Sequence, residues 1–246
     1  MTTVFKMLLQ ALSPLLSIMR IALFRGKSGM QRVTEPEVMD STQEAVEYDG
    51  MDFLEVNTAF AERAIALSPQ SGLILDAGTG TARIPILLCQ RRPQWQVIGI
   101  DLAQSMLEVG RQNVEQAGLQ QQIKLELVDA KQMPYPDAHF DMVVSNSIIH
   151  HLPDPLPFLQ ELKRVLKPKG AILLRDLIRP ASEEMLGEIV EKYAGDCNEH
   201  QKMLFSDSLY AAFTLDEVNE LIQKVSLAGV RVYQSSDRHW TAERAS

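Results

Sequence analysis

The sequence has little cysteine and no excess of positive charge. Cys89 and Cys197 are its only cysteines, too few for a disulfide framework, and no cysteine–histidine cluster has the spacing of a zinc site. We therefore expect a protein of a reducing compartment, the cytoplasm. The 32 acidic residues outnumber the 24 basic ones, and the net charge of −8 argues against a protein that coats nucleic acid.

Long uninterrupted apolar runs are also lacking, which bears on the N-terminal segment. From Val4 to Phe24 polar residues recur at steps of three or four, a spacing that predicts an amphipathic helical extension over residues 1–29. No apolar run reaches the roughly 20 residues that a bilayer requires, so we do not expect a spanning helix. The charged residues of this segment and its immediate continuation are all basic: Lys6, Arg20, Arg25, Lys27 and Arg32.

Three interpretations of residues 1–29 remain open. The segment packs on its own domain as a lid, or it lies on a membrane surface with its basic stripe toward anionic headgroups. In the third interpretation it is an extension without function ahead of a second start at Met30. A membrane-recruited scaffold is the non-enzymatic form of the second interpretation. A secretory signal is not expected, because no convincing cleavage site follows the apolar stretch.

The rest of the chain, residues 30–246, is expected to form a single domain. Residues 35–68 have apolar positions at helical spacing and predict a helical cap. In residues 72–176 short apolar runs alternate with helical segments, which predicts βαβ units and a doubly wound α/β fold with a parallel sheet. Residues 177–246 form a more variable region, which ends in an antiparallel hairpin.

The predicted strands share a feature at their carboxyl ends, where doubly wound sheets bind ligands. The strands are expected at Leu73–Leu75, Val97–Ile100, Ile123–Leu127, Phe140–Val144 and Ala171–Leu174. The first four are followed by polar residues, namely Asp76, Asp101, Asp129 and Ser145–Asn146. Taken singly, each aspartate is better explained as a helix cap or a solvated loop residue, and Ser145–Asn146 could simply end a strand. Their alignment along one edge of the sheet favours a binding site.

Other local patterns are clear in the sequence. Helices are expected at Ala82–Gln90, Gln104–Ala117, Phe158–Leu166 and Glu183–Tyr193, and a turn at Lys167–Gly170. Thr214 and Glu217 form a capping box that opens a helix to about Leu227. The runs Val230–Tyr233 and His239–Thr241 predict the terminal hairpin.

The stretch Leu75–Thr81 is the most informative part of the chain. Its glycine-rich turn, between a strand and a helix, lets the backbone approach a ligand closely. A dinucleotide site has the same beginning, but Arg83 occupies the place of its third glycine. Asp76 precedes the turn, where it can meet an ammonium group, and Asp129 suits an adenine amino group. With Asp101 for a ribose, these three partners describe S-adenosylmethionine.

The body of the chain resembles a class I S-adenosylmethionine-dependent methyltransferase, of the group that includes the ubiquinone/menaquinone-biosynthesis methyltransferases. The matching stretches are LDAGTGTARIP, VIGIDLAQSMLEVGRQN, LELVDAKQMPYPDAHFDMVVSNSIIHHLPDP and LKRVLKPKGAILLRD. The resemblance implies a seven-stranded, mostly parallel Rossmann-like sheet with a C-terminal antiparallel strand. It also implies S-adenosylmethionine as cofactor and in-line transfer of its methyl group.

The resemblance further implies which residues hold the cofactor. Those beside its methionine moiety and the transferred methyl group are Asp76, Gly78, Thr79, Gly80, Ser145 and Asn146. Those around its ribose and adenine are Asp101, Leu102, Met106, Asp129 and Ala130. Tyr48 resembles a tyrosine that covers the cofactor.

His150 and His151 are candidates for a general base at the acceptor, because an imidazole titrates near neutral pH. A structural role in shaping the loop is the alternative. No third ligand has suitable spacing, so no metal site is expected. The acidic charge and the absence of a target-recognition domain favour a small-molecule acceptor. Two rival functions remain open: an NAD(P)-dependent oxidoreductase and a non-catalytic, S-adenosylmethionine-binding regulator.

Overall fold

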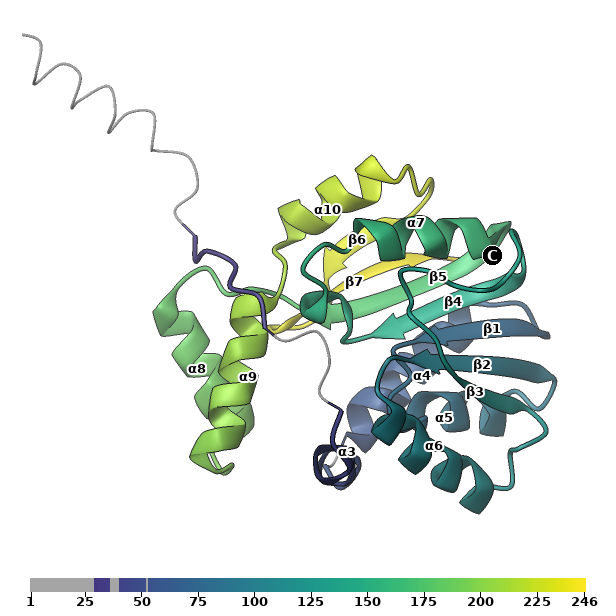
Figure 1. Ribbon diagram of the computed structural model, residues 1–246. Helices are drawn as coiled ribbons and strands as arrows, with labels where there is room; N and C mark the ends of the chain where they lie inside the picture. The colour runs from purple at the N-terminus through teal and green to yellow at the C-terminus, as the bar shows by residue number, and fades with distance from the viewer. Residues whose placement is uncertain (1–28, 36–39, 52) are drawn as a thin grey trace, which may run out of the picture.

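The computed structural model describes residues 29–35, 40–51 and 53–246 (Figure 1). The helix predicted over residues 1–29 therefore lies outside the described residues, apart from Gly29. None of the described helices is long and apolar enough to cross a bilayer. The division into a helical cap, a core and a variable region stays a prediction.

A seven-stranded sheet with the strand order β3-β2-β1-β4-β5-β7-β6 forms the centre of the described part. Its strands are β1 (Gly72–Ala77), β2 (Trp95–Asp101), β3 (Ile123–Leu127), β4 (Phe140–Asn146), β5 (Leu166–Leu177), β6 (Arg231–Gln234) and β7 (His239–Arg244). Strands β1 to β5 pair in parallel, and β7 runs antiparallel to both of its neighbours. The predicted α/β fold with a C-terminal antiparallel strand is confirmed.

Helices cover both faces of this sheet, and others lie beside it. The described helices are α3 (Thr42–Asp49), α4 (Leu54–Leu67), α5 (Arg83–Arg91), α6 (Gln104–Gln116), α7 (Leu156–Val165), α8 (Glu183–Ala194), α9 (Glu199–Ala211) and α10 (Leu215–Lys224). Figure 1 shows α4, α5 and α6 on one face and α7 and α10 on the other. A short 3-10 helix, η1 (Ile149–His151), follows β4.

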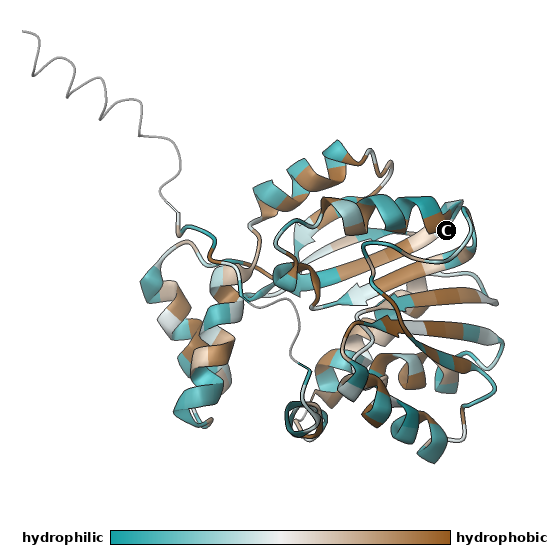
Figure 2. Cartoon of the chain, viewed as in Figure 1, coloured by the Kyte–Doolittle hydropathy of each residue, from teal (hydrophilic) through white to brown (hydrophobic). Residues whose placement is uncertain are grey.

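Apolar strands explain why the sheet is covered on both sides. Neighbouring residues of one strand point to opposite faces, and Ile74 and Leu75, both fully buried, belong to different core clusters. Phe60 belongs to the same cluster as Ile74, and Phe158 belongs to the same cluster as Leu75. The central strands are accordingly almost uniformly hydrophobic (Figure 2), as parallel sheets require.

Helices α8 and α9 form a pair beside the end of the sheet (Figure 1). The pair has a small core of its own, which includes Leu186 of α8 and Leu209 of α9. The sequence predicted α8 but missed α9, whose apolar residues have weak helical periodicity. One local pattern could have found it: Asn198 and Gln201 form a capping box at its start.

The segment of the expected helical cap, residues 35–68, contains two helices in its described part, separated between Asp49 and Leu54. Two sequence-based expectations about these elements are wrong. Lys167–Gly170 is part of β5 and not a turn, because the strand continues across an irregularity in its pairing with β4. The helix that begins after Thr214 ends at Lys224, before the expected Leu227.

Candidate functional site

A cavity of about 370 Å³ lies at the carboxyl ends of the strands, where the parallel sheet predicts a ligand site. Most of the residues predicted to bind the cofactor line it. They are Tyr48, Gly78, Gly80, Asp101, Leu102, Met106, Asp129, Ala130 and Asn146, and both candidate bases, His150 and His151, line it too. Asp76, Thr79 and Ser145 are not among the lining residues.

The glycine turn after β1 forms part of this lining. Gly78 (φ 74°) and Gly80 (φ 52°) both have left-handed backbone, which glycine adopts without steric cost. A Cβ at Gly78 would overlap the side chain of Ile148, so only glycine fits there. A Cβ at Gly80 would meet only Tyr48, at 3.9 Å. The turn is therefore open to a ligand at Gly80 and covered by Tyr48.

Asp101, at the end of β2, holds the turn in place. Its Oδ2 accepts a hydrogen bond of 2.8 Å from the Gly80 N–H, and its Oδ1 accepts one of 2.9 Å from the Ala103 N–H. Burial raises the pKa of Asp101, although these backbone hydrogen bonds favour the charged form. A carboxylate has about four lone-pair sites, so Asp101 keeps acceptor capacity toward the cavity.

Asp76 lies beneath the turn and is 1% exposed. Its Oδ2 accepts a 2.8 Å hydrogen bond from the Thr79 hydroxyl, but its Oδ1 has no hydrogen-bond partner among the described residues. Burial raises the pKa of Asp76 to about 7. Ser145 is equally buried and donates to the Ala77 carbonyl at 2.8 Å. All three residues outside the lining thus support the turn from behind.

The end of the cavity beyond β3 carries Asp129 and Ala130. Asp129 Oδ1 accepts from the Lys131 N–H at 2.8 Å and lies 3.0 Å from the Lys131 ammonium. Ala130 is 8% exposed, so the loop places little more than its backbone against the cavity. The Asp129 carboxylate has further lone pairs, which can accept a hydrogen bond from an amino group of a ligand.

Tyr48 reaches the cavity from α3. This helix is held by Arg83, the residue that stands where a dinucleotide site would have its third glycine. The Arg83 guanidinium forms a bidentate pair with Asp49, with distances of 2.8 Å from Nε to Oδ1 and 2.6 Å from Nη2 to Oδ2. Asn113 of α6 also donates to Asp49 at 3.0 Å. The Tyr48 ring packs against Phe53 with 5.3 Å between ring centroids. The cover over the turn is therefore anchored to α5 and α6.

His150 forms a buried pair with Asp176, at the end of β5. The two side chains are 4% and 1% exposed, and His150 Nδ1 lies 2.5 Å from Asp176 Oδ1. Asp176 Oδ2 accepts the N–H groups of Ile149 and His150 at 2.6 and 3.1 Å, which locks η1 against β5. Burial opposes a charge on the imidazole, but Asp176 and Glu35 outweigh it and raise the pKa of His150.

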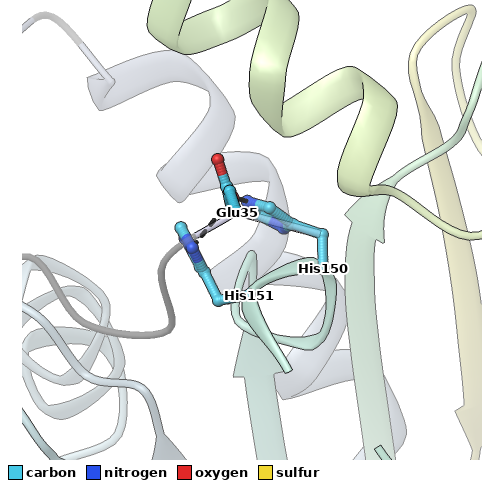
Figure 3. A group of neighbouring side chains, drawn as sticks. All are labelled: Glu35, His150 and His151. Atoms are coloured by element: carbon cyan, nitrogen blue, oxygen red, sulfur yellow. Dashed lines mark ion pairs between the residues drawn. The ribbon is translucent and has the colours of Figure 1, made fainter. Parts of the chain in front are cut away.

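Glu35 lies against both histidines, although over a hundred residues separate it from them (Figure 3). Its Oε1 is 2.9 Å from His151 Nδ1 and 3.4 Å from His150 Nε2. Ser208 of α9 donates to its Oε2 at 3.1 Å. Burial acts against its ionisation, but the histidines and Ser208 prevail and lower the pKa of Glu35.

The two histidines were predictable from the sequence, whereas Glu35 and Asp176 were not among the predicted site residues. Asp176 was detectable, because it is the polar residue that follows the apolar run of the fifth predicted strand. Nothing near Glu35 marks it, since its role depends on a long-range contact. The argument that a third metal ligand is lacking is wrong in its premise: potential ligand atoms of Glu35, His150 and His151 lie within 4.8 Å of one another.

Comparison with known proteins assigns this site to a family. The model of a family described as a methyltransferase domain matches residues 70–245. The chain belongs to this family. It is 39% identical, over 125 residues, to a demethylmenaquinone methyltransferase of Deinococcus radiodurans, and the match covers 50% of each protein. It is 27% identical to the methyltransferase GfsG of Streptomyces halstedii over 67% of this chain and 54% of GfsG. The methyltransferase chain thus spans about half the length of these relatives.

Solved structures show the same fold. A SAM-dependent methyltransferase from Aquifex aeolicus has a TM-score of 0.60 and 19% identity, with 83% of this chain and 98% of that one covered. Phosphoethanolamine N-methyltransferase 2 of Haemonchus contortus, solved with phosphomonomethylethanolamine and S-adenosylhomocysteine, has a TM-score of 0.63 and 21% identity. That match covers 79% of this chain and 44% of the other. The resemblance to class I methyltransferases is confirmed.

Proposed function

We propose that this methyltransferase transfers the methyl group of S-adenosylmethionine to a small-molecule acceptor bound in the same cavity. The observation that carries the proposal is the glycine turn, open at Gly80 and set between the carboxylates of Asp76 and Asp101 in a member of the family. The cofactor supplies an electrophilic sulfonium methyl group, whose carbon–sulfur bond breaks with its electron pair left on sulfur as the bond from the acceptor to carbon forms.

The residues around the turn suit this cofactor chemically. Asp76 Oδ1, which has no hydrogen-bond partner among the described residues, would attract the methionine ammonium group toward the turn. Asp101 would accept from the ribose hydroxyls, and Asp129 from the adenine amino group. Leu102 and Met106, which line the cavity, would pack against the adenine ring. Positioning two reactants in this way can lower the activation barrier by about 7–11 kcal/mol in favourable model reactions. The acceptor is the nucleophile, and the mechanism requires neither a metal nor a nucleophilic side chain.

His150 is our candidate for the group that removes a proton from the acceptor. Its Nδ1 is held by Asp176, so in the neutral imidazole Nε2 carries the lone pair. A structural role in the η1 loop is the alternative, and the two differ in pH dependence. The expectation that no metal is bound stays a prediction, and dialysis against a chelator tests it: unchanged turnover is expected.

The contact of residues 1–29 with a membrane also stays a proposal. Co-sedimentation of the full chain with anionic vesicles, compared with a chain that starts at Met30, tests it. Stronger sedimentation of the full chain is expected, and equal binding by both chains would remove the idea.

Titration calorimetry is the first test of the proposed function. S-adenosylmethionine, S-adenosylhomocysteine, NADH and NADPH are titrated in parallel, and only the first two are expected to bind. Binding of a nicotinamide nucleotide alone would overturn the proposal in favour of the oxidoreductase. Formation of a labelled product from labelled S-adenosylmethionine then separates the enzyme from a non-catalytic regulator.

A further inference from the structure

Two arginines line the end of the cavity that the cofactor residues do not occupy. Arg175 lies near the end of β5, and Arg238 lies in the turn between β6 and β7. Both side chains are partly buried. They lie at the same end of one strand pairing, because the end of β5 pairs with the start of β7. Leu177 and Phe205 line the same cavity.

Neither arginine has a carboxylate within 4.0 Å among the residues that the structure describes. Arg175 Nε donates to the Thr241 hydroxyl at 3.2 Å. The Arg238 guanidinium stacks on the Tyr193 ring, with 3.7 Å between Cζ and the ring centroid. By contrast, the more deeply buried Arg179 has its acid, Glu217, at 2.7 Å. A partly buried cation without a counter-ion is costly unless a ligand supplies one.

The two acids that act electrostatically on these arginines, Glu243 on Arg175 and Asp237 on Arg238, are engaged with other partners. The Asp237 carboxylate accepts hydrogen bonds from the Lys192 ammonium group at 2.6 Å and from the Tyr193 hydroxyl at 2.6 Å. Glu243 is held by Arg63 at 2.6 Å and by Arg231 at 2.6 Å. Neither carboxylate forms an ion pair with Arg175 or Arg238, although Asp237 acts on Arg238 from a longer distance.

The positive field at this end is visible in a neighbouring group. His239, which also lines the cavity, has its pKa lowered to about 4, by burial first and then by Arg238 and Arg175. It is therefore neutral at physiological pH, and the two guanidinium groups act on it more strongly than the carboxylates of Asp176 and Asp237, which act in the opposite direction. Burial also lowers the pKa of Arg175 and of Arg238, and an anion would relieve that cost.

The cavity is thus divided by charge along the sheet. Asp101, the last residue of β2, and Asp129, which follows β3, lie at one end with Lys131, whose ammonium group pairs with Asp129. The arginines belong to β5 and the β6–β7 turn. The positive charge of the cofactor is favoured on the side of Asp76 and Asp101, and an anion is favoured at the end that carries the arginines. Arginine forks also match the planar geometry of carboxylate and phosphate oxygens.

We infer that the methyl acceptor carries an oxyanion, a carboxylate or a phosphate, which Arg175 and Arg238 bind at the β5–β7 end of the cavity. This inference rests on the proposed function, because it takes the other end of the cavity for the cofactor. It narrows the acceptor from small molecules in general to anionic ones.

The test uses three aromatic probes of similar size: benzoate, phenyl phosphate and neutral benzyl alcohol. Each is titrated into the full chain saturated with S-adenosylhomocysteine. At least one of the two anions is expected to bind more tightly than the alcohol. The anion with the higher affinity shows whether the site prefers a carboxylate or a phosphate. Arg175→Gln and Arg238→Gln should each weaken that anion about tenfold. Arg111→Gln, which removes an exposed charge on α6, is the control and should leave it unchanged.

Two results would overturn the inference. One is that no anion binds better than benzyl alcohol, or that the control variant weakens binding as much as the cavity variants. The other is a loss of S-adenosylhomocysteine affinity in Arg175→Gln or Arg238→Gln, which would assign these arginines to the carboxylate of the cofactor itself. If the glutamine variants do not fold, Arg175→Lys and Arg238→Lys replace them. These variants keep the charge but lose the planar fork of the guanidinium group, and they should still weaken binding of the anion. Failure of the unmodified chain to bind S-adenosylhomocysteine would instead contradict the proposed function.

Discussion

His150 Nδ1 and Asp176 Oδ1 lie 2.5 Å apart in a part of the protein where neither side chain is more than 4% exposed. The pair joins the loop after β4 to the end of β5, and it places a titratable ring at the wall of the cavity. Burial alone would lower the pKa of the His150 imidazole, and the charge of Asp176 raises it instead. The pair is therefore the clearest point at which pH can act on the proposed reaction.

Asp176→Asn should shift the acid limb of the pH profile of kcat/KM to lower pH. The variant keeps the shape of the side chain but removes the charge that raises the pKa of His150, so the imidazole loses its proton at lower pH. The raised pKa also stabilises the fold at pH values below the ordinary histidine pKa, and that contribution disappears as the pH rises through the folded-state value.

The control for this prediction is Asp196→Asn, which changes an exposed aspartate outside the cavity. Its profile should superimpose on that of the unchanged protein. If Asp176→Asn lowers the rate equally at every pH, His150 has a purely structural role.

Asp76→Asn should stabilise the protein above about pH 7 and weaken S-adenosylhomocysteine binding. The pKa of Asp76 is raised to about 7, so the native state resists ionisation and loses stability as the pH rises from the ordinary aspartate range to 7. The gain in the free energy of unfolding is at most about 4 kcal/mol. Unfolding at pH 4 and pH 8 measures it: at pH 4 the two proteins should be nearly equal. A variant that binds the ligand unchanged would show that Asp76 serves only Thr79.

Arg83→Ala should weaken binding of S-adenosylhomocysteine about fivefold, or by about 1 kcal/mol. The change releases Asp49 and with it the helix that carries Tyr48 over the glycine turn. Calorimetry measures the affinity, and Arg91→Ala on the same helix provides the control. Equal affinity in the two variants would mean that α3 stays in place without the ion pair.

Glu243→Gln should lower the free energy of unfolding by about 1–3 kcal/mol at neutral pH. Hydrogen bonds from Arg63, Arg231 and Tyr233 hold the pKa of this carboxyl at about 2, in a side chain that is 4% exposed. A lowered pKa gives stability that is present above the ordinary glutamate pKa and is lost as the pH falls toward 2. The difference between the two proteins in urea unfolding should therefore shrink on acidification. A constant difference would point to packing alone.

The sheet and the cofactor end of the site were predictable because their causes are local. Apolar or alternating runs of three to five residues mark β1 to β4, and the residues that follow them lie at the edge where ligands bind. Gly78 and Gly80 stand out because their positive φ angles demand glycine. Arg83 was correctly taken as a departure from a dinucleotide site, but its partner Asp49 could not be inferred from spacing.

The acceptor end was not predictable, because contacts distant in sequence create it. Glu35 reaches the histidines across more than a hundred residues, and Phe205 comes from a helix without strong periodicity. Arg238 acquires its meaning only when the terminal hairpin pairs with β5. The β5 strand itself was placed too late in the chain, because Pro168 and Gly170 imitate a turn.

The position of β7 between β5 and β6 has a consequence for the order of folding. The strand completed last in sequence order is an interior one, so until residues 239–244 are made, β5 has an exposed edge that can pair with another chain. Strands β1 to β4, with the glycine turn and Asp101, need no residue beyond position 146 for their pairing. A growing chain can thus assemble its glycine-turn half first, and the arginine half is completed only after synthesis has passed β7.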